Sequence, residues 1–264
     1  MVKKDRIDLL LVGRGLVESR SLAQRLIMAG QVRANGQVVP KPASKVDIAA
    51  QLTIDRGPRF VSRGGNKLEA AFEAFPIDVA GLVCADVGAS TGGFTDCLLQ
   101  HGAAKVFAID VGHGVLHWKM RKDPRVVVME KSNARYIDSL IEPVEFVTID
   151  ASFISLKTLL PVVKGWSDSS QIIVLIKPQF EAGRREVARG KGVVRDPEIH
   201  RRVLIDLLLF VENMKFGLHG LIQSPVKGPK GNTEFLAWLS YPVSDKNLQG
   251  EALLARIDEI LDIY

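Results

Sequence analysis

Five polar side chains in this sequence closely follow short apolar runs, where the strands of an α/β sheet would end. They are Asp86, Asp110, Asn133, Asp150 and Lys177. In open α/β sheets ligands bind beyond the carboxyl ends of the strands, so these groups are candidates for one common site. A lysine is seldom buried without a partner, and Lys177 directly ends an apolar run. Its position indicates either a chemical task or a structural ion pair with Asp150.

A glycine-rich turn connects the first of these runs to a helix. Its glycines are Gly88, Gly92 and Gly93, spaced G-x-x-x-G-G, and Asp86 lies two residues before the first of them. A dinucleotide fold prefers G-x-G-x-x-G, whereas this spacing suits S-adenosylmethionine, whose methionine part needs room close to the backbone. Asp86 could then hold the ammonium group through water or backbone, and Asp110 could accept both ribose hydroxyls. A dinucleotide site and a tight turn without a ligand are the alternatives.

Alternating strands and helices must position these groups. Residues 82–110 read as strand, glycine turn, helix and strand, which is a βαβ unit. Further strands are predicted at 126–130, 144–150, 171–178, 217–224 and 234–239, and helices at 67–75, 154–163, 197–214 and 245–264. This alternation predicts an α/β fold built on a doubly wound parallel sheet.

The first quarter of the chain is strongly basic. Residues 1–63 contain 12 Lys and Arg against 5 Asp and Glu, a net charge of +7, and the remainder has 23 against 25, or −2. Helices are expected from Ile7 and from Ser19 to Gly30, then a hairpin over 32–39 that turns at Asn35-Gly36, and a strand over 51–54. A basic module beside a nearly neutral body indicates binding to a polyanion.

The basic module carries a recognisable pattern. Ser19-Arg20-x-x-Ala23-x-x-x-Ile27-x-x-Gly30-x-Val32-x-x-Asn35-Gly36, followed by Lys41-Pro42, resembles the RNA-binding domain named after ribosomal protein S4. The resemblance implies a small α+β domain that holds structured RNA with basic residues of its helix and hairpin. Cations on one face neutralise phosphates with weak sequence preference. The matching positions are Arg20, Arg25, Arg33, Lys41 and Lys45. A solvated basic face without a partner is the alternative.

From about Phe60 onward the chain resembles the FtsJ-like ribose 2′-O-methyltransferases, and over its whole length it resembles the TlyA family. The segments that carry this resemblance are 61–68, 86–96, 149–156, 176–181 and 231–234. It implies a Rossmann-like class I methyltransferase sheet, S-adenosylmethionine as cofactor, and ribosomal RNA or ribosomal subunits as partners. The predicted division is an RNA-binding domain at 1–56, a linker at 57–63 and a methyltransferase domain at 64–264.

The resemblance also assigns site residues. The catalytic tetrad of the family falls on Lys67, Asp150, Lys177 and Glu234. The implied donor pocket comprises Gly88, Ser90, Thr91, Gly92, Gly93 and Phe94, with Asp110 at the ribose and with Asn133 and Ala134 near the adenine. A basic loop over 227–232 precedes Glu234, and it either clamps substrate RNA or connects two strands.

The chemistry of the tetrad is base catalysis. Methyl transfer to a ribose hydroxyl is an in-line displacement at the sulfonium methyl, and the hydroxyl proton must leave. A lysine can take it if its pKa falls from about 10.4 toward roughly 7–8, a change that desolvation and a second ammonium favour. By the resemblance, Lys177 is the base and Lys67 holds the 2′-hydroxyl, while Asp150 orients Lys177 and Glu234 positions Lys67.

Other classes of protein find less support. No metal is expected, because His113 and His117 are four residues apart but have no evident third ligand. Cys84 and Cys97 are expected to be buried, reduced thiols. The sequence has neither an apolar run of membrane-spanning length nor an export signal, so a cytoplasmic protein that avoids membranes is predicted.

Two alternative functions stay open. Relatives of the family have carried the label haemolysin, which would imply a membrane-active protein. An RNA-binding protein that retains the S-adenosylmethionine pocket without catalysis is the other alternative.

Overall fold

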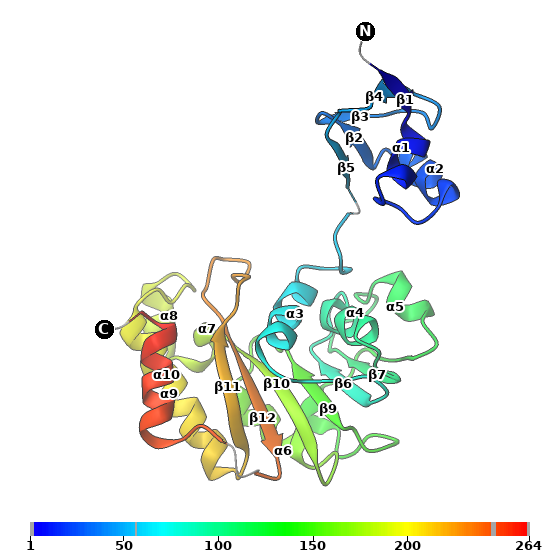
Figure 1. The fold of residues 1–264 in the computed structure, drawn as a ribbon. Helices are drawn as coiled ribbons and strands as arrows, with labels where there is room; N and C mark the ends of the chain where they lie inside the picture. Colours follow the sequence, from blue (N-terminus) through cyan, green and yellow to red (C-terminus); the bar gives the residue numbers. More distant parts are fainter. Residues whose placement is uncertain (1–2, 56, 244–246, 263–264) are drawn as a thin grey trace. The chain divides into compact units, whose positions relative to one another are not determined.

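The chain folds into two compact units (Figure 1). The computed structural model describes residues 3–55, 57–243 and 247–262. One unit spans Met1–Arg59 and the other Phe60–Tyr264, so the division falls inside the predicted linker. The exact domain boundaries, 1–56 and 64–264, stay a prediction.

The first unit is a small α+β fold. The Ser19 hydroxyl caps its second helix by accepting the N–H of Leu22 at 3.3 Å. The predicted hairpin is confirmed, since Asn35 and Gly36 have φ angles of +49° and +80°, both positive as a type I′ turn requires. Its elements are β1 (Lys4–Arg6), α1 (Ile7–Gly13), α2 (Arg20–Met28), β2 (Val32–Ala34), β3 (Gln37–Val38), β4 (Lys45–Asp47) and β5 (Leu52–Ile54). Strands β3, β2 and β5 form an antiparallel sheet, and β1 pairs with β4.

The second unit is built on a seven-stranded sheet with the order β11-β12-β10-β9-β6-β7-β8. Its strands are β6 (Val83–Val87), β7 (Lys105–Ile109), β8 (Val126–Met129), β9 (Phe146–Ile149), β10 (Ser170–Ile176), β11 (Gly217–Gln223) and β12 (Phe235–Tyr241). The five strands from β10 to β8 pair in parallel. Strand β12 is antiparallel to both of its neighbours, so it is the one reversed strand of this sheet.

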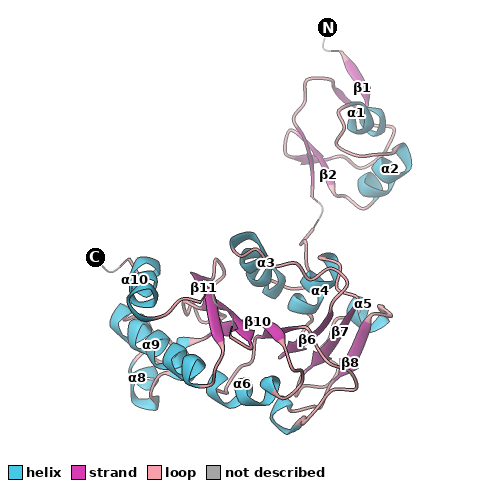
Figure 2. Ribbon diagram, turned by 60° about the horizontal axis from the view of Figure 1, so that its bottom comes forward, coloured by secondary structure: helices cyan, strands magenta, loops and turns pink. Residues whose placement is uncertain are grey.

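Helices cover both faces of this sheet (Figure 2). The longer helices are α3 (Gly64–Ala74), α4 (Gly93–Gln100), α6 (Leu156–Lys164), α9 (Pro197–Asn213) and α10 (Gly250–Ile260). Successive residues of β10 alternate between two cores. Ile172 and Val174 pack with α6, α9 and α10, whereas Ile173 and Leu175 pack with α3 and α4. Because the central strands β6, β7, β9 and β10 are buried on both faces, they read as nearly continuous apolar runs in the sequence.

The predicted α/β fold with its small N-terminal α+β domain is confirmed. The short helices α5 (Trp118–Lys122), α7 (Pro178–Glu181) and α8 (Arg184–Arg189) were not predicted. The reversal of β12 was not predicted either. A strand pattern gives the residues of a strand but not its direction, and the pairing energy with β10 and β11 decides that direction.

Candidate active site

The predicted site residues cluster where the sheet changes its winding direction. Strand β6 lies between β7 and β9, so the loops that leave β6 and β9 diverge to opposite faces. A cavity of about 230 Å³ opens at this edge. It is lined by Ser62, Arg63, Gly64, Lys67, Gly88, Ala89, Ser90, Thr91, Gly93, Phe94, Asp150, Val226, Lys227 and Pro229. The glycine turn, two tetrad residues and part of the basic loop 227–232 therefore face one space.

Gly88 allows the two loops to approach closely. Its φ angle is +86°, and a Cβ atom at this position would lie 2.7 Å from the backbone oxygen of Asp150. Only glycine combines this backbone angle with this contact. The glycine turn thus lies directly against the backbone of Asp150, at the end of β9.

Asp110 organises the second part of the glycine turn. Its Oδ2 accepts the backbone N–H of Ser90 at 2.8 Å and its Oδ1 accepts that of Gly112 at 2.7 Å. Asn133 is exposed, and its side-chain oxygen caps the 3₁₀ helix η1 (Ala134–Tyr136) by accepting the N–H of Arg135 at 3.1 Å. Asp110, Asn133 and Ala134 do not line the cavity itself. Their assignment to the ribose and the adenine stays a prediction.

Asp86 lies beneath the glycine turn and outside the cavity lining. Its carboxylate is fully buried in β6 and accepts the hydroxyl protons of Thr95 at 2.7 Å and Thr148 at 3.0 Å. Burial raises the pKa of Asp86 to about 6, and the charge of Asp150 adds to this rise. This geometry gives Asp86 no direct path to the cavity, so contact with a ligand would have to run through water or neighbouring groups.

Two ion pairs bring the four tetrad residues to this edge, and in both of them at least one partner is buried. Lys67 Nζ donates to Glu234 Oε2 at 2.6 Å, and Lys177 Nζ lies 2.5 Å from Asp150 Oδ1. Lys67 comes from α3, Glu234 directly precedes β12, and the other two follow β10 and β9. A short charge-assisted pair of this kind offsets part of the cost of removing its ions from water.

Lys177 makes further contacts with the loop that follows β9. Its ammonium donates to the carbonyl oxygens of Asp150 and Ala151, at 3.3 and 3.0 Å, and to the hydroxyl of Ser152 at 3.1 Å. With the Asp150 carboxylate, four oxygen atoms surround one nitrogen. They fix the position of that nitrogen beside Asp150, which lines the cavity.

The second carboxylate oxygen of Glu234 is buried. Within the described part of the chain, Oε1 has no hydrogen-bond partner, while Glu234 is only 1% exposed. A Cβ atom on Gly228 would lie 2.5 Å from this oxygen, so the loop 227–232 approaches it without a side chain. A buried carboxylate oxygen of this kind requires a donor from a water molecule or a ligand.

Two residues at this edge were missed by sequence reasoning. Glu130 follows β8, and its carboxylate accepts the N–H groups of Gly114, Val115 and Leu116 at 2.8, 3.0 and 3.1 Å and pairs with Arg121. Arg121 together with these N–H groups lowers the pKa of Glu130 to about 2. The signal that could have pointed to Glu130 was its position as an acidic residue at the end of a predicted strand.

Phe153 is the other missed residue. It is 89% exposed, has a φ angle of +64°, and packs its ring 5.0 Å from that of Phe180. A bulky residue with positive φ is a strained exception. Its position three residues beyond Asp150 places an exposed aromatic ring on the same loop as the Lys177 contacts.

The basic positions of the first unit differ in their surroundings. Arg25, Lys41 and Lys45 are exposed, and Arg33 is half-buried. Arg20 is held at its Nε by the buried carboxylate of Asp8, at 2.9 Å. RNA contacts of these side chains stay a prediction.

Comparison with known proteins gives consistent matches for both units. The FtsJ-like methyltransferase family matches residues 60–241, and the S4 domain family matches residues 5–52. The 16S/23S rRNA (cytidine-2'-O)-methyltransferase TlyA of Mycobacterium tuberculosis is 46% identical over 244 residues, covering 90% of this chain and 91% of the relative. Hemolysin A of Brachyspira hyodysenteriae is 42% identical over 236 residues, covering 88% of this chain and 98% of the relative.

Solved structures agree with these matches. A structure from Streptococcus thermophilus, provisionally named a hemolysin, is 40% identical, covers 100% of this chain and 98% of its own, and has a TM-score of 0.73. Among the described residues, no helix is both long enough and apolar enough to cross a membrane.

Proposed function

The chain belongs to the TlyA family of FtsJ-like methyltransferases, and from this premise we propose that it methylates a ribose 2′-hydroxyl of ribosomal RNA with S-adenosylmethionine. One observation carries the proposal. Lys67 and Asp150, each paired with a buried ion of opposite charge, line the same cavity as the glycine turn. A donor site and groups that can handle a proton therefore share one space.

The residues at the cavity fit S-adenosylmethionine. Bound there, the cofactor supplies an electrophilic methyl group on sulfur. The glycine turn offers a surface without long side chains for its methionine part, and Asp110 would accept its ribose hydroxyls. Each oxygen of Asp110 already accepts one N–H, and a carboxylate has about four acceptor sites in all. Asn133 and Ala134 would lie at the adenine.

Lys177 is the residue that would take the hydroxyl proton. As a neutral amine it accepts the proton while the new carbon–oxygen bond forms, and it becomes an ammonium ion. The four oxygen atoms around its nitrogen favour the ammonium ion that proton transfer produces, and they equally oppose the loss of a proton that must come first, so desolvation and the second ammonium, that of Lys67, would have to favour the neutral amine. Asp150 orients the amine toward the cavity.

Lys67 and Glu234 would position the acceptor. The ammonium of Lys67 donates to the attacking oxygen, while Glu234 keeps Lys67 in place through its 2.6 Å bond. The exposed ring of Phe153 offers a surface on which the base of the target nucleotide can stack, since single-stranded RNA bases commonly pack on aromatic side chains.

The first unit would hold the RNA. The TlyA relative from Mycobacterium tuberculosis is named for cytidine 2'-O-methylation of 16S and 23S rRNA, and the matching S4 domain makes the same partner class the best expectation here. We propose ribosomal RNA or an assembled subunit as substrate, and the cytoplasm, where ribosomes are built, as the location of the reaction.

The decisive experiment is transfer of labelled methyl from S-adenosylmethionine to ribosomal subunits that lack the modification. Nucleoside mass analysis identifies the acceptor atom. Lys177→Ala should retain cofactor and RNA binding and lose roughly 10²–10⁴-fold in turnover, the usual contribution of a general base. Lys105→Ala is the matched control, because Lys105 pairs with Glu142 at the opposite edge of the same sheet and should turn over normally.

Each outcome is informative. Near-normal turnover of Lys177→Ala would remove Lys177 from the base role while leaving the reaction class intact. Cofactor binding without transfer to either subunit or to naked RNA would favour a non-catalytic RNA-binding protein. Leakage of lipid vesicles by the wild-type protein would support the activity that the name of the Brachyspira relative suggests.

A further inference from the structure

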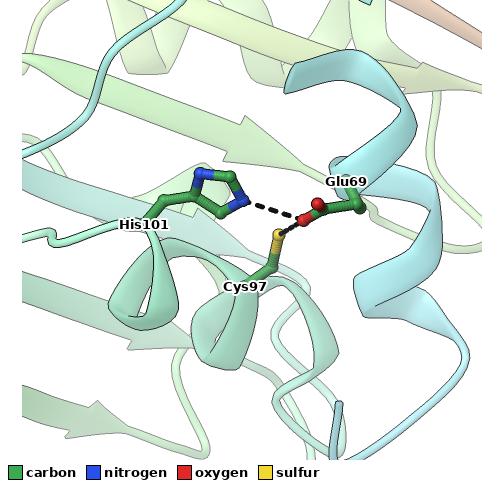
Figure 3. Close-up of side chains that lie close together, drawn as sticks. All are labelled: Glu69, Cys97 and His101. Atoms are coloured by element: carbon green, nitrogen blue, oxygen red, sulfur yellow. Dashed lines mark hydrogen bonds and ion pairs between the residues drawn. The ribbon is translucent and has the colours of Figure 1, made fainter. Parts of the chain in front are cut away.

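Outside the cavity, the packing of α3 against α4 gathers three side chains of the types that bind metals. Glu69, Cys97 and His101 each offer one ligand atom, and these atoms all lie within 4.8 Å of one another. Figure 3 shows the Glu69 carboxylate facing the Cys97 sulfur and the His101 ring. Within residues 3–55, 57–243 and 247–262, this is the one such group that the geometry identifies.

The positions of the three residues follow from helix geometry. Cys97 lies in α4 and His101 is the C-cap of this helix four residues later, so the two side chains lie on one side of it; the N–H of His101 donates to the carbonyl of Cys97 at 3.0 Å. Glu69 comes from the facing turn of α3. The ring of Phe72 packs 4.5 Å from that of His101 and restricts its orientation.

We propose that Glu69, Cys97 and His101 form a zinc-binding site. Sulfur, imidazole nitrogen and carboxylate oxygen are the ligand atoms that zinc prefers, usually in tetrahedral geometry. With ordinary zinc–ligand lengths, a tetrahedron separates sulfur and oxygen by about 3.6 Å, and nitrogen and oxygen by about 3.4 Å. Glu69 Oε2 lies 3.6 Å from Cys97 Sγ and 2.8 Å from His101 Nε2. Of these two distances to Glu69, only the one to His101 has to lengthen, and all three ligand atoms already lie within 4.8 Å of one another.

The net charge of the ligands and the access of solvent to the site also favour Zn²⁺. A thiolate and a carboxylate together neutralise Zn²⁺, so the occupied site carries no net charge in a region where Cys97 is fully buried. Binding releases the thiol proton to solvent, and the neutral imidazole coordinates through Nε2. The His101 side chain is 33% exposed, which leaves a side open for a water molecule as fourth ligand.

The site would connect the two helices that present the catalytic cavity. Glu69 lies two residues beyond Lys67 on α3, and α4 begins at Gly93 in the glycine turn. A bound zinc ion would therefore fix α3 against α4 as a structural cross-link. Zinc would hold these two helices together whether or not the chain transfers methyl groups.

The test uses the full-length protein, stripped with a chelator and then loaded with Zn²⁺ or Co²⁺. Zinc content is measured after removal of excess metal, zinc affinity by competition with a chromophoric chelator, and thiolate coordination from the cobalt charge-transfer band. The ligand variants are Cys97→Ser and His101→Gln, and the second keeps a side-chain N–H that can reach Glu69. The control is Cys84→Ser, because burial raises the pKa of the Cys84 thiol to about 12 and so keeps it protonated.

The wild type and Cys84→Ser should each retain one zinc ion per chain and show the cobalt band. Cys97→Ser should lose the band, and His101→Gln should bind zinc at least about tenfold more weakly, since loss of even an outer-shell partner costs 10–100-fold. Circular dichroism is used to test whether His101→Gln is folded. Absence of stoichiometric zinc in the wild type, or equal affinity in the wild type and both ligand variants, would overturn the proposal.

Discussion

At the scale of single residues, Glu234 links the basic loop to the tetrad. One carboxylate oxygen holds Lys67, and the other lies against Gly228, where a Cβ atom would come within 2.5 Å. The carboxylate cannot easily move away from Gly228, because Glu234 is almost fully buried. The absence of a side chain at position 228 is therefore part of how Lys67 is positioned.

Gly228→Ala should displace the Glu234 carboxylate and lower turnover. A displacement of about 1 Å in such a site commonly costs about 100-fold in rate, while binding of S-adenosylmethionine should change little. Turnover and calorimetric cofactor binding are the measurements. Gly183→Ala is the control, because a Cβ atom there meets its nearest neighbour at an ordinary 3.6 Å. Equal turnover of the two variants would show that Gly228 is not needed for positioning.

Asp86 gives the second unit a pH-dependent stability. Its folded pKa of about 6 lies above the unfolded value of about 3.9, so protonation favours the fold. This contribution is fully present below about pH 4 and is lost as pH rises through about 6. The loss amounts to roughly 3 kcal/mol, since each pKa unit corresponds to about 1.4 kcal/mol.

Comparing the wild type with Asp86→Asn tests this pH-dependent contribution of Asp86 to stability. Relative to the variant, the wild-type free energy of unfolding should fall between pH 4 and pH 7. Urea denaturation followed by tryptophan fluorescence measures it in the second unit alone, because all three tryptophans, at positions 118, 166 and 238, lie there. A difference that stays constant over this range would contradict the assigned pKa.

At the scale of elements, Glu130 fixes the segment that connects β7 to α5. Three consecutive N–H groups of this segment converge on its carboxylate, and Arg121 of α5 completes the contact. The segment begins directly after Asp110, the predicted ribose ligand. The pairing thus determines how the backbone leaves the donor site.

Glu130→Gln should weaken S-adenosylmethionine binding about tenfold without unfolding the protein. The charge that attracts Arg121 and the N–H groups is lost, and hydrogen bonds to charged groups contribute about 1.5–3 kcal/mol. Calorimetric titration measures the affinity. Glu142→Gln serves as the control, since Glu142 pairs with Lys105 at the opposite edge of the sheet. An unchanged affinity would separate this segment from donor binding.

At the scale of the whole molecule, the basic first unit should provide most of the RNA affinity. Arg25, Lys41 and Lys45 are exposed, whereas Arg20 also anchors the fold. The Asp8 carboxylate accepts from Arg6, Arg20 and Gln24, and these contacts hold its pKa well below the usual range. Substitution of Arg20 would therefore confuse lost RNA contacts with lost stability.

The triple variant Arg25→Gln/Lys41→Gln/Lys45→Gln tests this role. Each neutralised phosphate contact contributes about 0.7–0.9 to the dependence of log affinity on log salt, so the slope should fall by about 2–3. Filter binding of ribosomal RNA at several salt concentrations measures it, and cofactor affinity should stay unchanged. A slope equal to that of the wild type would assign the RNA contacts to other residues.

The sequence alone determined the features that depend on local pattern. The strands and long helices follow from apolar periodicity, the hairpin from Asn35-Gly36, and the two domain types from motifs of a few tens of residues. The positions of Asp110, Asp150 and Lys177 at strand ends followed in the same way. These predictions hold because a strand buried on both faces must be apolar along its length and polar where it leaves the core.

Which distant groups meet depends on how the helices and strands pack in three dimensions. Lys67 and Glu234 are 167 residues apart, and Glu69 is 28 residues before Cys97, so no local pattern connects them. The burial of Asp86 beneath the glycine turn and the reversed direction of β12 depend likewise on neighbouring elements. Packing of side chains between elements supplies the energy for these contacts, and that energy depends on the positions of all partners together rather than on any stretch of sequence.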